Sequence, residues 1–477
     1  MVVSVGSTAV LARLLEPSAF GLATAALGIL ALPSSVFDGA LGIRLIQADQ
    51  LDDETVSNTL SVSILMSVPV TVILILAASP LESLMGFPGL ANILGVSAIA
   101  LVFRSMGSVA RSILIRQRRL IALSLASVCA TAVGALVVSC GLALAGFGVW
   151  SIIIGAIATT TIESLVNLWQ AQPFWRPKVS PRIAIGIIRP GGLYALSQIL
   201  NWVSNSGTGL VTGRALGAHD LGHYSRGNKL LEIVTSAVGE PTMRVLLPSF
   251  SRLQGDTKGA RALFIRAISS SSIVFSVIGF VCVVHTGAIV LALLGPAWQD
   301  TVPIAQVLFL SLVARCNYKV TESVTFGMGA ARLAVSRQAI FATIALTMVL
   351  LGTQFGLIGV AVGTTCGLWL IYLTSLVFAS RLVGLHCRRL LKPHLIGLLW
   401  GGLVAGADLA MLEGALALGV NFWAAHLGAG FVALASLATF IAAAPRRCMP
   451  GDFARFRDLA LAKLLRSIRR YQGEDAK

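Results

Sequence analysis

Charged side chains are scarce in this sequence of 477 residues, where Asp, Glu, Lys and Arg together make up only 12%. Average soluble domains carry roughly a quarter of such residues. Hydrophobic residues reach 56%, the mean hydropathy is +0.86, and apolar runs recur along the whole chain. Because a membrane span needs about 20 mostly apolar residues, the sequence predicts an all-α polytopic membrane protein. It excludes a soluble nucleic-acid-binding protein.

Signatures of enzymes and of metal sites are absent from the sequence. There is no P-loop, no HExxH zinc motif and no GxSxG nucleophile turn. The seven cysteines and six histidines lack the spacing of a disulfide framework or a metal site. We therefore expect no enzyme, no catalytic residue, no bound metal and no cofactor, apart from a coupling ion such as H⁺ or Na⁺.

Apolar windows between Gly, Pro and charged residues predict thirteen full spans. They cover residues 18–43, 57–79, 88–115, 120–144, 148–169, 186–213, 221–249, 263–293, 301–328, 333–354, 357–380, 394–411 and 420–444. The first twelve residues are apolar too. At about 1.5 Å per residue they are too short to cross the hydrocarbon core. A truncated first helix is therefore expected, and it brings the number to fourteen.

The net charge of +16 is explained by membrane orientation. With the N-terminus in the cytoplasm, the cytoplasmic loops hold sixteen cations and the tail after residue 444 holds nine, whereas the opposite side holds only Arg13 and Arg214. Since cytoplasmic loops are enriched in Lys and Arg, both termini are predicted to be cytoplasmic. The tail places apolar and basic residues on opposite helical arcs, which predicts contact with membrane lipids.

An internal repeat divides the chain into two halves. Residues 13–21 match 214–222 at a shift of 201, and residues 147–155 match 355–363 at a shift of 208. The matches predict two parallel six-helix repeats with a cavity between them. The expected order is an N-terminal bundle with a truncated first helix (1–170), a cytoplasmic linker (171–185), a second bundle (186–380), two additional helices (394–444) and a basic amphipathic tail (445–477).

Ionisable residues inside spans are costly, so each requires a partner, an aqueous cavity or a function. In the span 221–249 they follow helical steps of three and four and form one stripe: Arg226, Lys229, Glu232, Ser236, Glu240 and Arg244. Such a stripe either lines a cavity or forms ion pairs along the helix. Arg315 and Lys319 share a face with Glu322, where Lys319 and Glu322 have the spacing of a local pair. Arg104 lies near the middle of its span.

Neutral and acidic side chains complete the set of candidates. Gln198, Asn201, Asn205, Thr208 and Thr212 form a seam that either lines a sugar path or bonds to another helix. The acidic residues within spans are candidates for a coupling proton or sodium ion, with structural pairing as the alternative for each: Asp38, Glu163, Glu232, Glu240, Glu322 and Asp408. His285 lies deep in a span and is expected to be a buried histidine with its hydrogen bonds satisfied.

A string of motifs, in order, resembles the Wzx-type polysaccharide flippases. They are residues 12–21, 45–47, 51–54, 221–226, 244–248, 251–254, 293–295, 298, 302–303 and 355–363. The nearest branch is that of the WzxC-like polysaccharide transport proteins of the multidrug/oligosaccharidyl-lipid/polysaccharide superfamily. The resemblance implies a V-shaped transporter of the bacterial inner membrane. It would move undecaprenyl-diphosphate-linked oligosaccharide to the periplasmic leaflet by alternating access, for exopolysaccharide or O-antigen assembly, alongside a glycan polymerase and export machinery.

A diphosphate that crosses a low-dielectric core must be neutralised, and Arg matches phosphate oxygens. The candidate cations are Arg104, Arg226, Lys229, Arg244, Arg315 and Lys319, with Gln198, Asn201 and Asn205 offered to sugar hydroxyls. Three alternatives compete. A multidrug exporter of the same superfamily is disfavoured because a cationic cavity repels cationic drugs. A membrane-embedded glycan polymerase or ligase is disfavoured by the short outer loops, and a non-transporting scaffold by the polar interior of the repeat.

Overall fold

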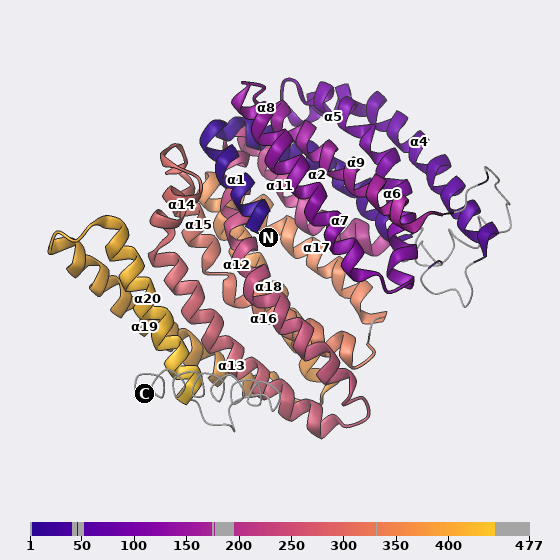
Figure 1. Cartoon of the computed structure of the whole chain (residues 1–477). Coiled ribbons are helices and arrows are strands. Elements are labelled where there is room, and N and C mark those ends of the chain that lie inside the picture. Colours follow the sequence, from indigo (N-terminus) through magenta and orange to yellow (C-terminus); the bar gives the residue numbers. More distant parts are fainter. Residues whose placement is uncertain are drawn as a thin grey trace, which may run out of the picture. The chain divides into compact units, whose positions relative to one another are not determined.

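The computed structural model describes residues 2–40, 45, 52–173, 176, 195–330 and 332–443. Every regular element in this part of the chain is a helix (Figure 1). The predicted linker 171–185 lies mostly outside the described residues, and the predicted tail 445–477 lies wholly outside them. The all-helical prediction is confirmed.

The helices of the N-terminal part follow the apolar runs of the sequence. They are α1 (Val2–Leu14), α2 (Pro17–Ala40), α4 (Asp53–Met85), α5 (Leu90–Ala98), α6 (Ala100–Arg116), α7 (Leu120–Thr131), the π-helical segment η1 (Ala132–Ser139), α8 (Cys140–Leu144) and α9 (Val149–Ala171). Asp52 caps α4 by accepting a hydrogen bond from the backbone N–H of Thr55 at 3.2 Å, and Gly86 ends the helix in the left-handed conformation.

In the rest of the chain, long continuous helices alternate with helices that are interrupted. They are the π-helical segment η2 (Val203–Gly207), α11 (Thr208–Leu216), α12 (Ala218–Ser251), α13 (Thr257–Val284), α14 (Thr286–Leu293), the 3₁₀ turn η3 (Pro296–Trp298), α15 (Thr301–Phe309), α16 (Leu312–Gly327), α17 (Arg332–Thr353), α18 (Gly356–Leu382), the 3₁₀ turn η4 (Cys387–Leu390), α19 (Leu391–Ala417) and α20 (Phe422–Ala443).

Eight of the described helical stretches are long and apolar enough to cross a membrane, and three shorter apolar helices accompany them. The predicted span 221–249 is helical as α12, but its charged stripe keeps it out of the eight. Three spans predicted as continuous are interrupted: 88–115 breaks at Ile99, between α5 and α6, 263–293 breaks at His285, between α13 and α14, and 301–328 breaks at Leu310 and Ser311, between α15 and α16. Apolar composition alone does not reveal such breaks, because both halves remain hydrophobic.

The chain forms two compact units. The first contains residues 1–227, 289–304 and 335–363, and the second contains residues 228–288, 305–334 and 364–477. Within the first unit, one apolar cluster consists of Leu45, Val56, Leu60, Val109 and Ile113. The core of the second unit is built largely on α12, α13, α16 and α18, with the rings of Phe250, Phe264 and Tyr372 fully buried.

Two glycines of the repeated motif make reciprocal contacts within the first unit. A Cβ atom on Gly21 would lie 2.6 Å from the carbonyl carbon of Ala218, and one on Gly222 would lie 2.7 Å from the carbonyl carbon of Pro17. Gly21 and Gly222 are related by the shift of 201, and so are Pro17 and Ala218. The backbones of α2 and α12 therefore touch at equivalent points of the two motif copies, where only glycine leaves enough room.

The described residues place several motif side chains around Trp298, which is fully buried in the first unit. Its indole N–H donates to the carbonyl oxygen of Ala12 at 2.7 Å, and its ring meets Phe20 and His223 edge-on at 5.3 and 5.4 Å. A ring nitrogen of His223 bonds to the hydroxyl of Thr301 at 2.8 Å. These motif residues therefore stabilise the junction of α1, α2, α12 and η3.

Candidate functional site

A pocket opens inside the first unit between α2, α5, α6 and α9. Its volume is about 380 Å³, and its walls combine leucine and isoleucine side chains with a polar set. The polar set consists of Ser34, Ser35, Asp38, Ser97, Arg104 and Thr160. A mostly apolar pocket with a few convergent polar groups is the usual form of a small-molecule binding site.

An ion pair joins the two charged residues of this pocket. Arg104 Nη2 lies 2.5 Å from Asp38 Oδ2, and both side chains remain about one-third exposed. The Nε atom of Arg104 is buried and has no hydrogen-bond partner among the described residues. The guanidinium group therefore keeps a donor in reserve after pairing with the carboxylate.

A second polar recess adjoins this pocket and shares Asp38, Arg104 and Thr160 with it. It adds Arg111, Glu163 and Asn167, together with two serines. The side-chain oxygen of Asn167 is buried without a hydrogen-bond partner in the described structure. Sequence reasoning missed Asn167, although its position four residues after Glu163 places both on one face of α9.

The charges of this site are balanced, since it pairs two arginines with two carboxylates. The candidate cations of the sequence predict a more positive lining. The difference arises because Asp38 and Glu163, predicted either to carry a coupling ion or to form a structural pair, line the same recess as Arg104 and Arg111, and Asp38 pairs with Arg104.

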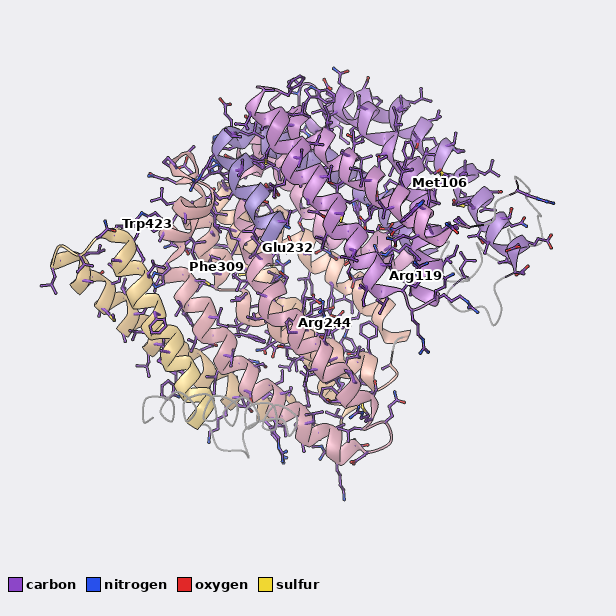
Figure 2. The ribbon with its side chains drawn as sticks, viewed as in Figure 1. Met106, Arg119, Glu232, Arg244, Phe309 and Trp423 are labelled. Carbon is purple, nitrogen blue, oxygen red and sulfur yellow. The ribbon has the colours of Figure 1, made fainter. Side chains whose placement is uncertain are left out.

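The charged stripe of α12 splits into members with different environments. Arg226, in the first unit, places its guanidinium carbon 4.6 Å from the centre of the Phe20 ring. Lys229 pairs with Glu232 at 3.0 Å, both on the surface of the second unit. Arg244 is exposed near the end of α12, as Figure 2 shows together with Glu232. Ion pairs and exposed cations thus occur along one helix, and the cavity-lining interpretation of the stripe stays a prediction.

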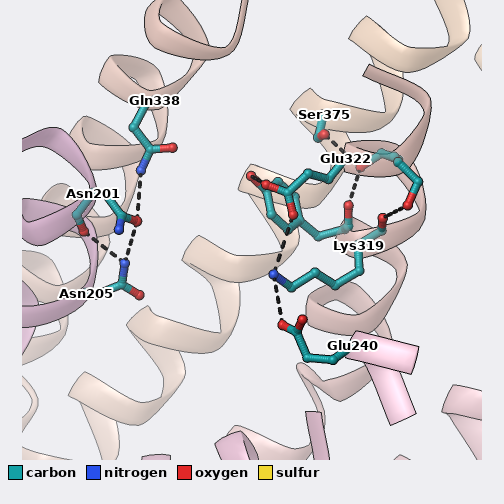
Figure 3. Close-up of polar contacts among 10 residues, drawn as sticks. Asn201, Asn205, Glu240, Lys319, Glu322, Gln338 and Ser375 are labelled. Carbon is teal, nitrogen blue, oxygen red and sulfur yellow. Dashed lines mark hydrogen bonds and ion pairs between the residues drawn. The ribbon is translucent and has the colours of Figure 1, made fainter. Parts of the chain in front are cut away.

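Lys319 is the centre of a charge cluster in the second unit, between α12 and α16. Its amino group lies 3.3 Å from Glu240 and 3.5 Å from Glu322, as Figure 3 shows. Tyr318 donates from its hydroxyl to Glu322 at 3.5 Å. Arg315, one turn before Lys319, donates to the side-chain oxygen of Asn228 at 3.2 Å. The predicted local pair of Lys319 and Glu322 is present, and Glu240 is the additional partner.

The neutral seam of the first unit does not keep to one face. Gln198 reaches the carbonyl oxygen of Ser35 at 3.5 Å. Asn201 and Asn205 are exposed and bonded to each other at 2.9 Å, with Gln338 of α17 at 3.5 Å from Asn201 (Figure 3). Thr208 and Thr212 are buried and donate to carbonyls of their own helix.

Comparison with known proteins places this geometry in a family. Residues 10–303 match the family model described as "Polysaccharide biosynthesis protein". The chain is 25% identical over 329 residues to the succinoglycan biosynthesis transport protein ExoT of Rhizobium meliloti (strain 1021), over 67% of this chain and 65% of that protein. It is 23% identical over 306 residues to the lipopolysaccharide biosynthesis protein WzxC of Escherichia coli (strain K12), over 63% of this chain and 61% of that protein. The match thus spans somewhat less than two thirds of either relative.

Solved structures show the fold. The lipid II flippase MurJ, in an inward closed conformation, superposes with a TM-score of 0.74 at 12% identity, covering 92% of this chain and 96% of MurJ. An inward-facing multidrug resistance MATE transporter of the MOP superfamily superposes with a TM-score of 0.64 at 14% identity, covering 80% of this chain and 94% of that one. These relatives are transporters and flippases rather than enzymes, in agreement with the sequence. The chain is a multi-pass membrane protein with the MOP fold, and it belongs to the polysaccharide biosynthesis protein family.

Proposed function

We propose that this protein is a flippase for lipid-linked oligosaccharide. It moves an undecaprenyl-diphosphate-linked glycan from the cytoplasmic to the periplasmic leaflet of the bacterial inner membrane, for exopolysaccharide or O-antigen assembly. Membership of the polysaccharide biosynthesis family, combined with the fold of a lipid II flippase, is the observation that carries this proposal. The names of ExoT and WzxC, which refer to succinoglycan transport and lipopolysaccharide biosynthesis, support the same class of substrate.

The diphosphate is proposed to be neutralised by cations that already hold weaker partners. Arg104 pairs with a carboxylate that is about one-third exposed and keeps an unpaired, buried Nε donor, and Lys319 lies between two carboxylates. A phosphate group makes stronger, bidentate contacts with a guanidinium than a single carboxylate oxygen does. In this mechanism the substrate displaces Asp38 from Arg104. The displaced acid, or Glu163 beside it, then becomes available for a coupling proton or sodium ion.

The other cations contribute according to their surroundings. Arg244 is exposed and offers a first contact to an anionic headgroup, with Lys229 of the same stripe and Arg315 of α16 as further cations of the second unit. Arg226 is held against Phe20, so we assign it mainly to packing. The amides of Asn201 and Asn205 are exposed and able to exchange their mutual hydrogen bond for one with a sugar hydroxyl.

Alternating access between two parallel six-helix repeats is the proposed transport cycle. The reciprocal contacts of Gly21 and Gly222 support such a repeat, because residues related by one sequence shift meet at equivalent positions. The excess of Lys and Arg in the predicted cytoplasmic loops supports cytoplasmic termini.

A multidrug exporter is the second candidate function. It is favoured by the balanced charge of the recess around Arg104, which repels a cationic drug less than an excess of cations does. The two functions differ in substrate charge, so one set of strains separates them.

The deciding experiment measures the sidedness of lipid-linked oligosaccharide in a host that lacks this gene. We expect completed units to accumulate on the cytoplasmic face and to be released by the intact gene. Arg104→Ala should abolish this rescue while the protein remains in the membrane, and Lys258→Ala, an exposed cation at the start of α13, should retain it. Unchanged oligosaccharide sidedness in the deletion host, together with a susceptibility to cationic drugs that the intact gene restores, would establish the exporter instead.

A further inference from the structure

We propose that His285, Asp408 and His426 form a proton-binding site that couples the two additional helices, α19 and α20, to α13. The site lies wholly in the second unit and shares no residue with the pocket around Arg104. It stands independently of the flippase proposal. Its ligand is a single proton held by three side chains.

The three side chains lie in series, joined by one ion-pair contact and one hydrogen bond. Asp408 Oδ2 lies 3.0 Å from His285 Nε2, and the side chain of Asp408 is completely buried. On the other side of the same ring, His285 Nδ1 lies 2.8 Å from His426 Nδ1. Both carboxylate oxygens of Asp408 and the Nε2 atom of His285 are buried and make no hydrogen bond within the described residues, so the contact between these two side chains is an ion-pair distance. His285 therefore occupies the middle position between an acid and a second base.

The packing of α19 explains why the carboxylate reaches His285. The buried face of this helix consists of His394, Gly397, Gly401, Ala405, Asp408 and Leu412. A Cβ atom on Gly401 would lie 2.8 Å from Phe280 and from Ser276, so the backbones of α13 and α19 approach closely. Because the neighbours of Asp408 on this face are small, its short side chain meets the histidine at the end of α13.

The burial of Asp408 determines how many protons the site must hold. An ionised carboxylate buried at membrane depth is strongly disfavoured unless a nearby positive charge neutralises it. One proton shared by the acid and the histidines makes the cluster neutral. A second proton would leave a buried net charge of +1. We call the state in which α19 and α20 pack against α13 docked. In this docked state the cluster is therefore most stable with one proton, rather than none or two.

The order of the three side chains accommodates one shared proton. With Asp408 ionised, the Nε2 atom of His285 faces the carboxylate at an ion-pair distance. The shared proton then makes His285 an imidazolium that also donates from Nδ1, and His426 accepts with its own Nδ1. The carboxylate of Asp408, the imidazolium of His285 and the neutral imidazole of His426 thus follow one another in a compatible order. A further proton on His426 would place two N–H donors face to face.

The distance between the rings excludes a metal ion as the ligand of this site. A zinc ion binds each imidazole nitrogen at about 2.0–2.1 Å, which separates two tetrahedral ligands by more than 3 Å. The two Nδ1 atoms are 2.8 Å apart, which is a hydrogen-bond distance. The only carboxylate lies on the far side of His285, where it cannot act as a third ligand to the same ion.

Few other titratable groups lie near the cluster along its own helices, and α16, which packs against α13 where Gly279 meets Leu312, has its first charged residue at Arg315. Within two helical turns of its members, the sequences of α13, α14, α15, α19 and α20 contain only Cys282 and Glu413 as further titratable residues. The side chain of Glu413 is exposed on the surface. The protons that bind as α19 and α20 separate from α13 are therefore those of His285, Asp408 and His426.

The proposal predicts how docking depends on pH. When α19 and α20 have separated from α13 at acidic pH, the three side chains bind two protons, one on each histidine. When these helices are docked, the three side chains hold one proton. Since the undocked state binds one proton more, docking must weaken as pH falls, by about tenfold per pH unit below the ordinary range of histidine titration.

The experiment measures the docked fraction of the full chain in lipid nanodiscs. After the seven native cysteines are replaced, spin labels are attached to Gly287→Cys on α14 and Leu427→Cys on α20, both exposed positions. Electron double resonance then gives the ratio of short to long distances between about pH 6 and about pH 4.5, below the ordinary range of histidine titration. The slope of the logarithm of this ratio against pH counts the protons taken up on undocking.

The slopes measured for wild type and three variants must follow a fixed order. Wild type should give a slope of about one. His426→Gln removes the site of the extra proton while keeping an amide beside His285, so its slope should fall to about zero. Asp408→Asn removes the charge that holds the first proton, so its slope should rise to about two and undocking should begin at higher pH. His386→Gln, an exposed histidine before η4, is the matched control and should equal wild type.

Several results would overturn the proposal. A wild-type distance that does not change between the two pH limits would show that the cluster is only structural. If the His426→Gln variant undocks at acidic pH with the wild-type slope, a group other than His426 binds the extra proton. A shift in the distances on adding a chelator at constant pH would establish a metal ion as the ligand. Circular dichroism and elution volume report whether each variant is folded, so a misfolded variant is not counted as undocked.

Discussion

Replacement of Gly222 by alanine should destabilise the protein, although alanine favours helices. The new Cβ atom would lie 2.7 Å from the carbonyl carbon of Pro17, and ordinary contact begins at 3.4 Å, so the backbones of α2 and α12 must move apart by at least 0.7 Å. Overpacking of this kind costs ~1–3 kcal/mol, while the helix propensity of alanine returns ~1 kcal/mol. Because the obstructing atoms are backbone atoms that cannot rotate away, we expect a net loss of ~2 kcal/mol.

Thermal unfolding of the purified protein, monitored by the loss of the monodisperse elution peak, measures this effect. Gly222→Ala should lower the apparent Tm. Gly28→Ala is the matched control, because it changes a glycine in α2 whose nearest new contact, with Leu210, would be an ordinary 3.8 Å. That control should keep or raise the Tm, since it gains helix propensity without a clash.

The reciprocal geometry adds a sharper test. Gly21→Ala should be destabilising for the same reason, since its Cβ would lie 2.6 Å from the carbonyl carbon of Ala218. A separation of α2 from α12 that accommodates one new methyl group also makes room for the other. The double variant with Gly222→Ala should therefore lose less stability than the sum of the two single losses. Strict additivity, or a Gly222→Ala protein as stable as the control, would refute the contact.

Two further predictions concern side chains with defined partners. Lys319→Met should leave Glu240 and Glu322 without their shared cation and lower the Tm, and adding Glu240→Gln should recover part of the loss; failure of this second change to help would show that the pair contributes no stability. Trp298→Phe keeps most of the ring packing but loses the hydrogen bond to Ala12, and unfolding measurements should find a cost of ~1–2 kcal/mol, whereas a Tm equal to that of wild type would assign the indole N–H no role.

Interactions between neighbouring turns of one helix were predictable from spacing. The pair of Lys319 and Glu322 is three residues apart, and so is the pair of Lys229 and Glu232. Ion-pair partners on other helices were not predictable, because nothing in a local pattern shows that Glu240 of α12 lies opposite Lys319 of α16. Asp408 is the clearest case, since its partner His285 lies more than a hundred residues away.

Helix irregularity limited the prediction of shared faces. The seam from Gln198 to Thr212 assumes a constant helical period, but the π-helical segment η2 begins after its second member and contains its third, Asn205. A π turn contains more residues than an α turn and rotates the following positions. Asn205 is consequently exposed, while Thr208 is buried. The general fold survives such a shift, because hydrophobic runs identify helices whether or not one of them contains a π turn.

The longer π-helical segment, η1, lets the N-terminal bundle tolerate a change in chain length. Ala132–Ser139 lies against α9, and a Cβ on Gly134 would be 2.8 Å from the carbonyl oxygen of Gly155. Deletion of one residue from this segment would let it relax to an α-helix, because the wider π turns hold about one residue more than the α turns that replace them. Homologous chains that differ here by one residue would therefore keep the same side of α8 toward its neighbours, although their sequences align with a gap.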